Sequence, residues 1–353
     1  MKRKSLKKRG LLIGALLFLL AAMICLSACG GPKIYIYTWG DYLDPDVIKE
    51  FEKETGIKVK YVTFETNEAM YTKISRGGAK YDVIICSDYI VERMIAADLL
   101  LELDYEKIPN AQHIDPTYKG LPYDPGDKYS VPYTFGTMGI IYNKKMVTET
   151  VDSWEILWDE KYKNNIIMMD SMRDTFLVPL AILKHDINTT DRQKLEEAKD
   201  LLVQQRPLVR AYLVDRIRDD MKKNEAALAL IWSCDFLLVQ FDNTDLEYVI
   251  PKEGSNLWVD AFVVPKASRN QEYAQQFIDF MCSKDAALGN SVYINGPTPQ
   301  LEARAAQPEQ LRNNPAAYPS PEELERCRLF ADLDAQARKL YDELWHKAKT
   351  EKP

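Results

Sequence analysis

Tryptophans and carboxylates recur together along this chain in a pattern that suits the binding of an organic cation. Three such groups are present: Trp39 with Asp41 and Tyr42, Trp232 with Asp235, and Trp258 with Asp260. The face of a tryptophan ring attracts an ammonium group by about 0.5–1 kcal/mol when exposed and about 2 kcal/mol when desolvated. Aromatic walls also pack alkyl carbons, and carboxylates make charge-assisted hydrogen bonds with amines. A flexible cation charged at both ends would therefore need a carboxylate at each end of an aromatic slot.

Two further groups of small and acidic residues follow short apolar runs. They are Ser87, Asp88 and Tyr89 after residues 81–86, and Asp170, Ser171 and Asp174 after residues 165–169. For any one tryptophan–acid pair, the ordinary alternative is a tryptophan that covers the core beside an acid in a solvated turn. Because the pairing recurs at three places, a binding site explains the pattern as well as this ordinary alternative does.

The elements that must position these residues alternate between strand and helix. The patterns predict strands over 33–38, 58–64 and 81–87, and helices over 45–55 and 67–76. This order is typical of a mostly parallel sheet with helices on both faces. Ligands of such sheets bind beyond the carboxyl ends of the strands, which is where Trp39 and Ser87 fall.

The rest of the chain continues this alternation after one long extended run over 130–143. That run contains Gly136 and Gly139, which suggests a bend or a close backbone approach. Further on, the patterns predict strands over 165–169, 226–232 and 257–264, and helices over 154–161, 175–184, 192–204 (opened by a Thr190…Gln193 capping box), 219–223, 270–283 and 321–349. Long strands near 134–139 and 257–262 would join two α/β units into two lobes that close over a ligand by hinge bending.

The charge is distributed unevenly along the 353 residues, whose formal net charge is -7. Residues 1–28 contain six basic residues and no acid, so 40 basic and 53 acidic residues remain after them. The remaining body is thus more acidic than the whole chain. An acidic body argues against a nucleic acid partner and is compatible with a cationic one.

The N-terminus has the pattern of an export signal. A basic segment precedes the apolar run 11–26, which is shorter than the roughly 20 residues that span a bilayer. The sequence Leu26-Ser27-Ala28-Cys29-Gly30 resembles the bacterial lipobox, in which the cysteine becomes the lipidated first residue. We therefore expect residues 1–28 to be a lipoprotein signal peptide, 29–32 a lipidated linker, and the protein to be lipid-anchored at the extracytoplasmic face of the cell membrane. The alternatives are a plain secretory signal and an uncleaved anchor.

The remaining cysteines are widely spaced and form no C-x-x-C pair: Cys86, Cys234, Cys282 and Cys327. Their pairing stays open, although the strand pattern around Cys86 favours a free core thiol. The chain has only three histidines, far apart, and none of the common hydrolase, nucleotide or metalloprotease motifs. Catalysis and a metal site are therefore disfavoured, and no cofactor is expected.

Several ordered segments resemble the extracytoplasmic spermidine/putrescine-binding proteins of ABC transporters. They are residues 37–42 (YTWGDY), 51–59 (FEKETGIKV), 65–71 (ETNEAMY), 81–83 (YDV), 128–133 (KYSVPY), 258–260 (WVD) and 296–299 (GPTP). The resemblance covers essentially all of residues 33–350. It implies a type II periplasmic-binding-protein fold, with two α/β lobes, a hinge and a polyamine in the cleft between the lobes. We assign 33–136 plus 260–300 to lobe 1 and 137–259 plus 301–353 to lobe 2.

The same resemblance implies the ligand-binding residues. Trp39, Tyr89, Trp232 and Trp258 match the aromatic box of the family, Asp260 matches a carboxylate that holds an amine, and Ser87 matches a small polar lining residue. Asp170 or Asp174 would supply the second carboxylate. Asp41 and Tyr42, beside Trp39, are further candidate ligand-binding residues. The chain departs from the family pattern at Gly296, Ala331 and Val214, where polar or aromatic contacts are missing, so the preferred polyamine stays open. The implied partner is an ABC permease; the alternatives are another organic cation or solute in the same fold, or a cleft hydrolase.

Overall fold

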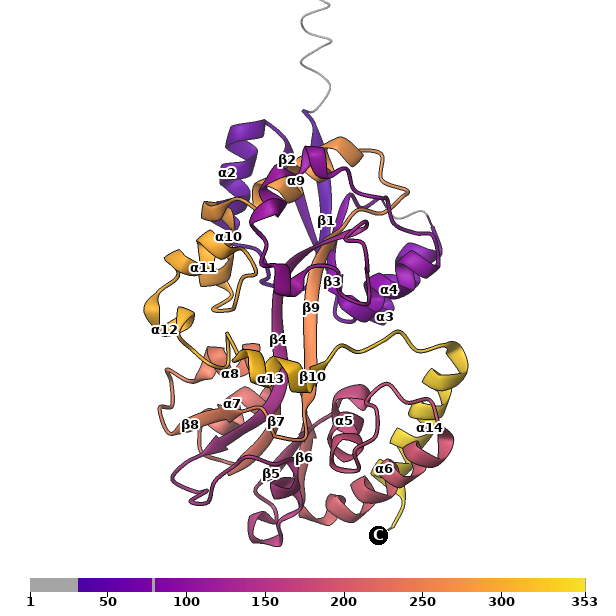
Figure 1. Ribbon diagram of the computed structural model, residues 1–353, viewed down its shortest axis with the longest axis vertical. Helices are drawn as coiled ribbons and strands as arrows, with labels where there is room; N and C mark the ends of the chain where they lie inside the picture. The colour runs from indigo at the N-terminus through magenta and orange to yellow at the C-terminus, as the bar shows by residue number, and fades with distance from the viewer. Residues whose placement is uncertain (1–30, 78–79, 353) are drawn as a thin grey trace, which may run out of the picture.

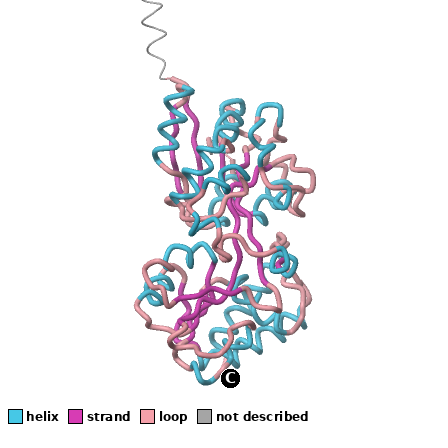
Figure 2. The backbone as a smooth tube through the Cα atoms, turned by 60° about the vertical axis from the view of Figure 1, so that its left-hand side comes forward, coloured by secondary structure: helices cyan, strands magenta, loops and turns pink. Residues whose placement is uncertain are grey.

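The structure is a computed structural model that describes residues 31–77 and 80–352. The predicted signal peptide and Cys29 lie outside these residues. Figure 1 shows two α/β halves, one above the other, which we call lobe 1 (upper) and lobe 2 (lower). Two long strands, β4 (Ser130–Asn143) and β9 (Ser255–Val263), run from one lobe into the other. Figure 2 shows the same strands passing through the junction between the lobes.

Lobe 1 is built on the predicted alternation of strands and helices. Its N-terminal elements are β1 (Lys33–Thr38), α2 (Pro45–Thr55), β2 (Lys58–Thr63), α3 (Asn67–Ser75), β3 (Val83–Ser87) and α4 (Asp88–Ala96). Strand β1 pairs in parallel with both β2 and β3, which confirms the predicted parallel arrangement. The helices α9 (Gln271–Met281), α10 (Lys284–Tyr293) and α11 (Leu301–Ala306) return to this lobe from the C-terminal part of the chain.

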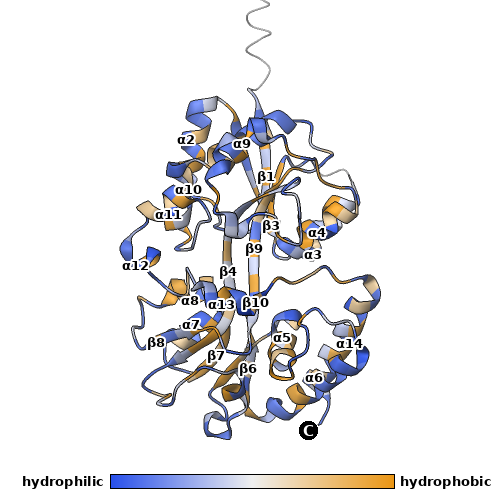
Figure 3. Cartoon of the chain, viewed as in Figure 1, coloured by the Kyte–Doolittle hydropathy of each residue, from blue (hydrophilic) through white to orange (hydrophobic). Residues whose placement is uncertain are grey.

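Lobe 2 contains a second, mostly parallel group of strands. Its elements are β5 (Ile166–Met169), α5 (Met172–Ile182), α6 (Arg192–Gln205), β6 (Val209–Leu213), α7 (Arg216–Lys222), β7 (Leu228–Trp232), α8 (Ser233–Val239) and β8 (Leu246–Val249). Strand β5 pairs in parallel with β6 and β7, while β8 lies antiparallel to β4. The entirely apolar β7 is coloured hydrophobic in Figure 3, as expected for a strand in the centre of a lobe. The sequence patterns missed β6 and β8, which are short and only partly buried.

One continuous sheet order joins the lobes: β2-β1-β3-β9-β4-β7-β5-β6. The first half of β4 pairs with β9, from Ser130 opposite Val263 to Thr137 opposite Leu257. Its second half pairs with β7, beginning at Met138 opposite Trp232. Strand β4 therefore changes partners between the lobes, while β9 stays paired with β4 and pairs with β3 only over residues 260–263.

The two glycines of β4 permit close approach, as the sequence predicts. A Cβ atom at Gly136 would lie 2.3 Å from Cζ2 of the Trp258 ring, and one at Gly139 would lie 2.5 Å from the Val249 carbonyl oxygen. Both distances are far below van der Waals contact. These positions therefore bring β4 against its neighbours more closely than any side chain would allow.

The prediction of one continuous last helix over 321–349 is wrong, because a short strand and an extended segment interrupt the helical structure. Residues 321–350 form α13 (Pro321–Arg326), the short β10 (Cys327–Arg328), an extended segment and α14 (Ala335–Thr350). Strand β10 pairs in parallel with β9, and the Asp334 side chain caps the start of α14. The segment 329–334, which we call the strap, is extended because it makes tertiary contacts with both lobes.

Two smaller predictions also need correction. Helix α6 is capped by the Asp191 side chain, which accepts from the Lys194 N–H, and not by the predicted Thr190 capping box. The segment predicted as a helix over 154–161 forms two 3₁₀ turns, Trp154–Trp158 and Glu160–Tyr162.

The lobe boundaries stay a prediction. Since α11 packs against α10, we propose that the boundary at 300/301 be moved beyond α11, towards α12 (Glu309–Arg312).

The strap carries an ion pair between the lobes. Asp332 Oδ1 lies 2.6 Å from Nη2 of Arg93 on α4, and the Asp332 N–H donates to Glu92 at 2.6 Å. On the lobe 2 side, Arg173 of α5 donates to the Ala331 carbonyl at 3.3 Å. The Arg173 guanidinium also lies 4.3 Å from the centre of the Phe330 ring. The strap therefore makes polar contacts with both lobes.

Removing the Arg93 side of this ion pair is expected to destabilise the protein. The two side chains are only 11% and 22% exposed, so Arg93→Met leaves the Asp332 carboxylate partly buried without this partner. We expect the free energy of unfolding to fall by roughly 1–3 kcal/mol, measured by denaturant titration. Lys49→Met is the matched control because its ion pair with Asp46 is 73% and 84% exposed, and it should change stability little. Equal losses in the two variants would contradict the prediction.

Candidate ligand-binding site

The first part of the site lies where β1, β3 and β9 come together. Ser87, the last residue of β3, is directly opposite Asp260 of β9, and Trp39 follows the end of β1. Asp260 is 5% exposed, and its Oδ2 accepts a hydrogen bond from the Tyr42 hydroxyl at 2.5 Å. Burial raises the pKa of Asp260, while the nearby polar groups of Tyr42, Ser87 and Trp39 lower it. The structure therefore brings together four of the predicted residues.

The turn that carries Trp39 and Tyr42 is held by two tyrosines that sequence reasoning missed. Tyr61 of β2 donates to the Trp39 carbonyl at 2.8 Å and accepts from the Tyr42 N–H at 3.2 Å. Tyr133 of β4 donates to the Tyr42 carbonyl at 2.6 Å. Tyr133 sits where the register of β4 shifts between Pro132 and Thr134. The register shift in β4 thus orients the Tyr133 side chain towards the turn.

A second hydrogen-bonded group lies at the start of α3 and α4. Asn67 Nδ2 donates to Ser87 Oγ at 3.0 Å and to the Tyr89 hydroxyl at 3.1 Å. The Tyr89 hydroxyl in turn donates to Glu68 Oε1 at 3.1 Å. Tyr89 packs against hydrophobic cores of both lobes, so it lies at their junction. The family-like segment 65–71 was the only signal for Asn67 and Glu68.

Lobe 2 contributes a second buried carboxylate beside a tryptophan. Asp174 of α5 is 7% exposed and accepts from Ser171 Oγ at 2.5 Å. Trp232, which ends β7, donates its indole N–H to Asp174 Oδ1 at 3.4 Å. Burial raises the pKa of Asp174, and the hydrogen bonds from Ser171 and Trp232 lower it. Each lobe therefore presents one buried acid next to a tryptophan.

Several buried polar atoms of these residues have no hydrogen-bond partner among the described residues. They are Trp39 Nε1, Asn67 Oδ1, Trp258 Nε1 and Asp260 Oδ1. Most buried polar groups in folded proteins are hydrogen-bonded, and leaving one unpaired costs about 1–3 kcal/mol. Two of the four, on Asn67 and Asp260, are acceptors. All four atoms are therefore candidates for hydrogen bonds to a polar ligand.

Comparison with known proteins identifies the family to which this arrangement belongs. Residues 46–319 match the model of the bacterial extracellular solute-binding proteins. The chain belongs to this family. The spermidine/putrescine-binding periplasmic protein 1 of Haemophilus influenzae is 33% identical over 92% of this solute-binding protein and 91% of the relative. The spermidine/putrescine-binding periplasmic protein of Escherichia coli is 33% identical over 90% and 91% of the two chains.

Solved structures agree with this assignment. The spermidine/putrescine substrate-binding protein PotD of Streptococcus pneumoniae superimposes with a TM-score of 0.83 at 39% identity, over 90% of this chain and 98% of that one. A PotD lipoprotein of Treponema pallidum superimposes with a TM-score of 0.82 at 30% identity, over 90% and 99%. The predicted periplasmic-binding-protein fold and the predicted resemblance to spermidine/putrescine-binding proteins are confirmed.

Not every predicted ligand residue of this solute-binding protein joins the site. Asp170 is exposed and pairs with Lys349 of α14 at 2.8 Å, so Asp174 is the lobe 2 acid that stands beside the tryptophan. Asp41 is exposed, with a φ of 48°, and makes no hydrogen bond to the site residues. Asp235 pairs with Arg218 at 3.3 Å. Asp88 accepts from the backbone N–H groups of Tyr89 and Val259, which gives it a structural role.

Other features of the solute-binding protein lie outside this site. Cys86, Cys234, Cys282 and Cys327 form no disulfide with one another within the residues that the structure describes. Within residues 31–77 and 80–352, no cluster of three or more metal-binding side chains is present, and no helix is long and apolar enough to span a membrane.

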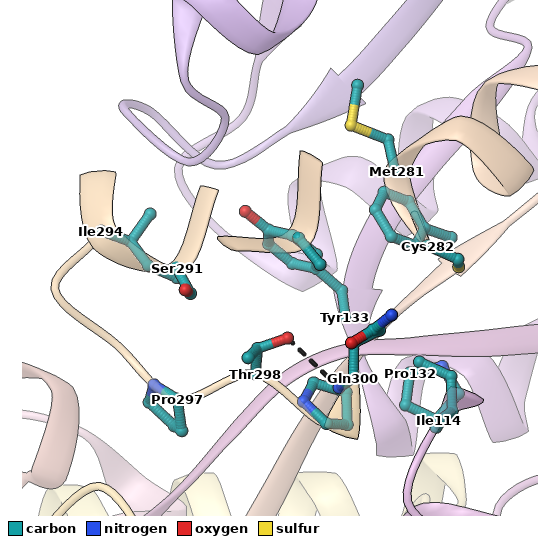
Figure 4. Close-up of a pocket in the computed structure, with 13 residues that line it drawn as sticks. Ile114, Pro132, Tyr133, Met281, Cys282, Ser291, Ile294, Pro297, Thr298 and Gln300 are labelled. Carbon is teal, nitrogen blue, oxygen red and sulfur yellow. Dashed lines mark hydrogen bonds between the residues drawn. The ribbon is translucent and has the colours of Figure 1, made fainter. Parts of the chain in front are cut away.

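Figure 4 shows a pocket in lobe 1 lined by residues such as Tyr133, Thr298 and Gln300, with the Gln300 N–H donating to Thr298 Oγ1 at 3.2 Å. None of the predicted ligand residues lines it.

Proposed function

We propose that this solute-binding protein captures a polyamine, spermidine or putrescine, between its lobes and delivers it to the permease of an ABC transporter. The observation that carries the proposal is the pair of buried carboxylates, one in each lobe and each beside a tryptophan. Asp260 stands with Trp39 in lobe 1, and Asp174 with Trp232 in lobe 2. Two separated acids suit a flexible cation with a charge at each end.

The aromatic residues would pack the methylene chain between the two ammonium groups. Trp258 lies opposite Gly136 in the paired strands at the junction, and Tyr89 packs against both lobes. A ligand that contacts acids of both lobes binds the closed arrangement better than an open one. Closure follows, because a ligand shifts a conformational equilibrium only by its differential affinity for the two states. The closed lobes would then form the surface that the permease recognises.

Binding of the polyamine is tested by titrating the soluble chain, residues 30–353, with spermidine, putrescine, spermine and basic amino acids. Tryptophan fluorescence and heat are the two signals, because Trp39, Trp232 and Trp258 lie in the proposed slot. We expect saturable binding of at least one polyamine. No response to any polyamine would overturn the ligand assignment, and a response only to another cation would replace it.

We also propose that Cys29 is lipidated and tethers the protein at the extracytoplasmic face of the cell membrane. The support is the lipobox-like segment 26–30 after a basic and apolar leader. Acyl chains contribute about 0.8 kcal/mol per buried CH₂, so several chains on one cysteine hold a protein at a membrane. In a bacterial host, Cys29→Ala is expected to block lipidation, measured by labelling with a fatty acid analogue and by gel mobility. Cys234→Ala is the matched control and should be labelled like the wild type. Labelling of Cys29→Ala would contradict the proposal.

A further inference from the structure

Asn67 occupies an unusual position at the start of α3. The residue directly follows the N-cap Thr66, whose side chain accepts from the Ala69 N–H. Asn67 is 5% exposed, whereas its neighbours Thr66 and Glu68 are exposed. The Asn67 amide therefore points into the protein and not towards solvent. Buried amides normally make hydrogen bonds with both their nitrogen and their oxygen.

The two ends of the Asn67 amide have different surroundings. Its Nδ2 donates to both Ser87 Oγ and the Tyr89 hydroxyl, at 3.0 and 3.1 Å, and so uses both of its N–H groups. Its Oδ1 has no partner among the described residues. The orientation of the amide follows from Tyr89, whose hydroxyl donates its proton to Glu68 Oε1, so a flipped amide oxygen would face the Tyr89 oxygen with no proton between them. One buried carbonyl oxygen thereby remains an acceptor that none of the described residues uses.

The unpartnered oxygen belongs to the same group of residues as the lobe 1 acid. Ser87, which accepts from Asn67, lies directly opposite Asp260 in the β3–β9 pairing and lowers the pKa of the Asp260 carboxyl. Asp260 also has one oxygen, Oδ1, that makes no hydrogen bond with any residue the structure describes. Two side chains, one charged and one neutral, thus neighbour the same serine, and each carries an acceptor oxygen that no described residue pairs with. A primary ammonium has three N–H donors and needs more than one acceptor when it leaves water.

We infer that Asn67 is a further ligand-binding residue, whose Oδ1 accepts an N–H from the ammonium group held by Asp260. The inference rests on the proposed polyamine function. The same side chain positions Tyr89 through its second N–H, so one residue links an ammonium acceptor to the aromatic wall at the lobe junction. Asn67 replaces water around the ammonium without adding a second negative charge.

The test compares three variants with the wild-type protein. Asn67→Leu removes the acceptor and both donors at similar volume, while Asn67→Asp keeps an acceptor oxygen. Thr66→Ala removes the cap of α3 without touching the slot and serves as the matched control for helix destabilisation. For each protein, the measurements are the spermidine and putrescine Kd by calorimetry and the Tm without ligand.

We expect Asn67→Leu to raise the Kd about tenfold or more. Its Tm without ligand should change little, because removal of an unpaired buried oxygen offsets the loss of the two hydrogen bonds donated to Ser87 and Tyr89. Asn67→Asp keeps an acceptor oxygen but loses both N–H donors, so it should bind more weakly than the wild type and more tightly than Asn67→Leu, and Thr66→Ala should lower the Tm with an unchanged Kd. An unchanged Kd in Asn67→Leu overturns the inference. The inference is also overturned if Asn67→Leu and Thr66→Ala both lower the Tm and both raise the Kd, because destabilisation of α3 would then explain the weaker binding. If Asn67→Leu does not fold, loss of binding in well-folded Asn67→Asp overturns it. Failure of the wild type to bind any polyamine is a separate result, which overturns the proposed function together with this inference.

Discussion

Asp260→Asn is expected to weaken polyamine binding about tenfold or more. One carboxylate oxygen accepts from the Tyr42 hydroxyl at 2.5 Å, and the other, Oδ1, is buried with no hydrogen-bond partner in the described part of the chain. An asparagine keeps the size of the side chain but removes the charge that pairs with an ammonium group. A hydrogen bond to a charged group contributes about 1.5–3 kcal/mol, and each 1.4 kcal/mol is about tenfold in Kd. Calorimetric titration with spermidine and putrescine measures the change.

The matched control for this prediction is Asp170→Asn. It makes the same chemical change in an exposed aspartate that pairs with Lys349, and we expect a Kd within about twofold of the wild type. Asp88→Asn should also matter less for binding, because Asp88 accepts from backbone N–H groups and does not face the slot through a free oxygen. An unchanged Kd in Asp260→Asn would remove Asp260 from the site.

The same carboxyl predicts a pH dependence of binding. Burial raises the pKa of Asp260 above its usual value of 3.8 in the free protein. Only the deprotonated carboxylate pairs with an ammonium group, so the affinity should be greatest above this raised pKa and should fall as the pH drops through it. Asp260→Asn should flatten that part of the profile, whereas Asp170→Asn should keep it.

Gly136→Ala is expected to disturb both the lobe junction and the aromatic slot. The added Cβ would lie 2.3 Å from Cζ2 of Trp258 and 2.6 Å from Ser233 Oγ. Trp258 is directly opposite Gly136 in the β4–β9 pairing, so its ring must leave its position or the strands must separate. Overpacking of this kind costs about 1–3 kcal/mol of stability. We therefore expect a lower Tm and, in the folded fraction, a Kd raised by about tenfold or more because Trp258 is displaced.

Gly126→Ala is the control for that substitution. A Cβ at Gly126 would meet only the flexible Lys128 side chain, 3.3 Å away at its nearest atom, and we expect a change within about 0.5 kcal/mol. Thermal unfolding and spermidine titration are measured for both variants. A Gly136→Ala protein with the stability and affinity of Gly126→Ala would show that Trp258 can move without cost.

The local elements of lobe 1 were predictable because their signals lie within a few residues of each other. The bounds of β1 and α2 agree with the pattern-based expectation. Asp44 caps α2, Pro45 stands at its first turn, and Gly56 ends it with a φ of 71°. The strap was not predictable in the same way. Its residues follow a short helix and precede a long one, but contacts with Arg93 and Arg173 keep the segment extended.

For the site, the sequence alone determined the kind of chemistry. Tryptophans next to acids indicated an organic cation, and the segment 258–260 placed Trp258 and Asp260 in one strand. Only the tertiary structure distinguishes Asp170 from Asp174, since the two lie four positions apart in the chain while their surroundings differ completely. It alone also turned Asn67 inward beside Ser87 and Tyr89. The physical reason is that residue type fixes which interactions a side chain can make, whereas burial and partners depend on segments that are distant in the chain.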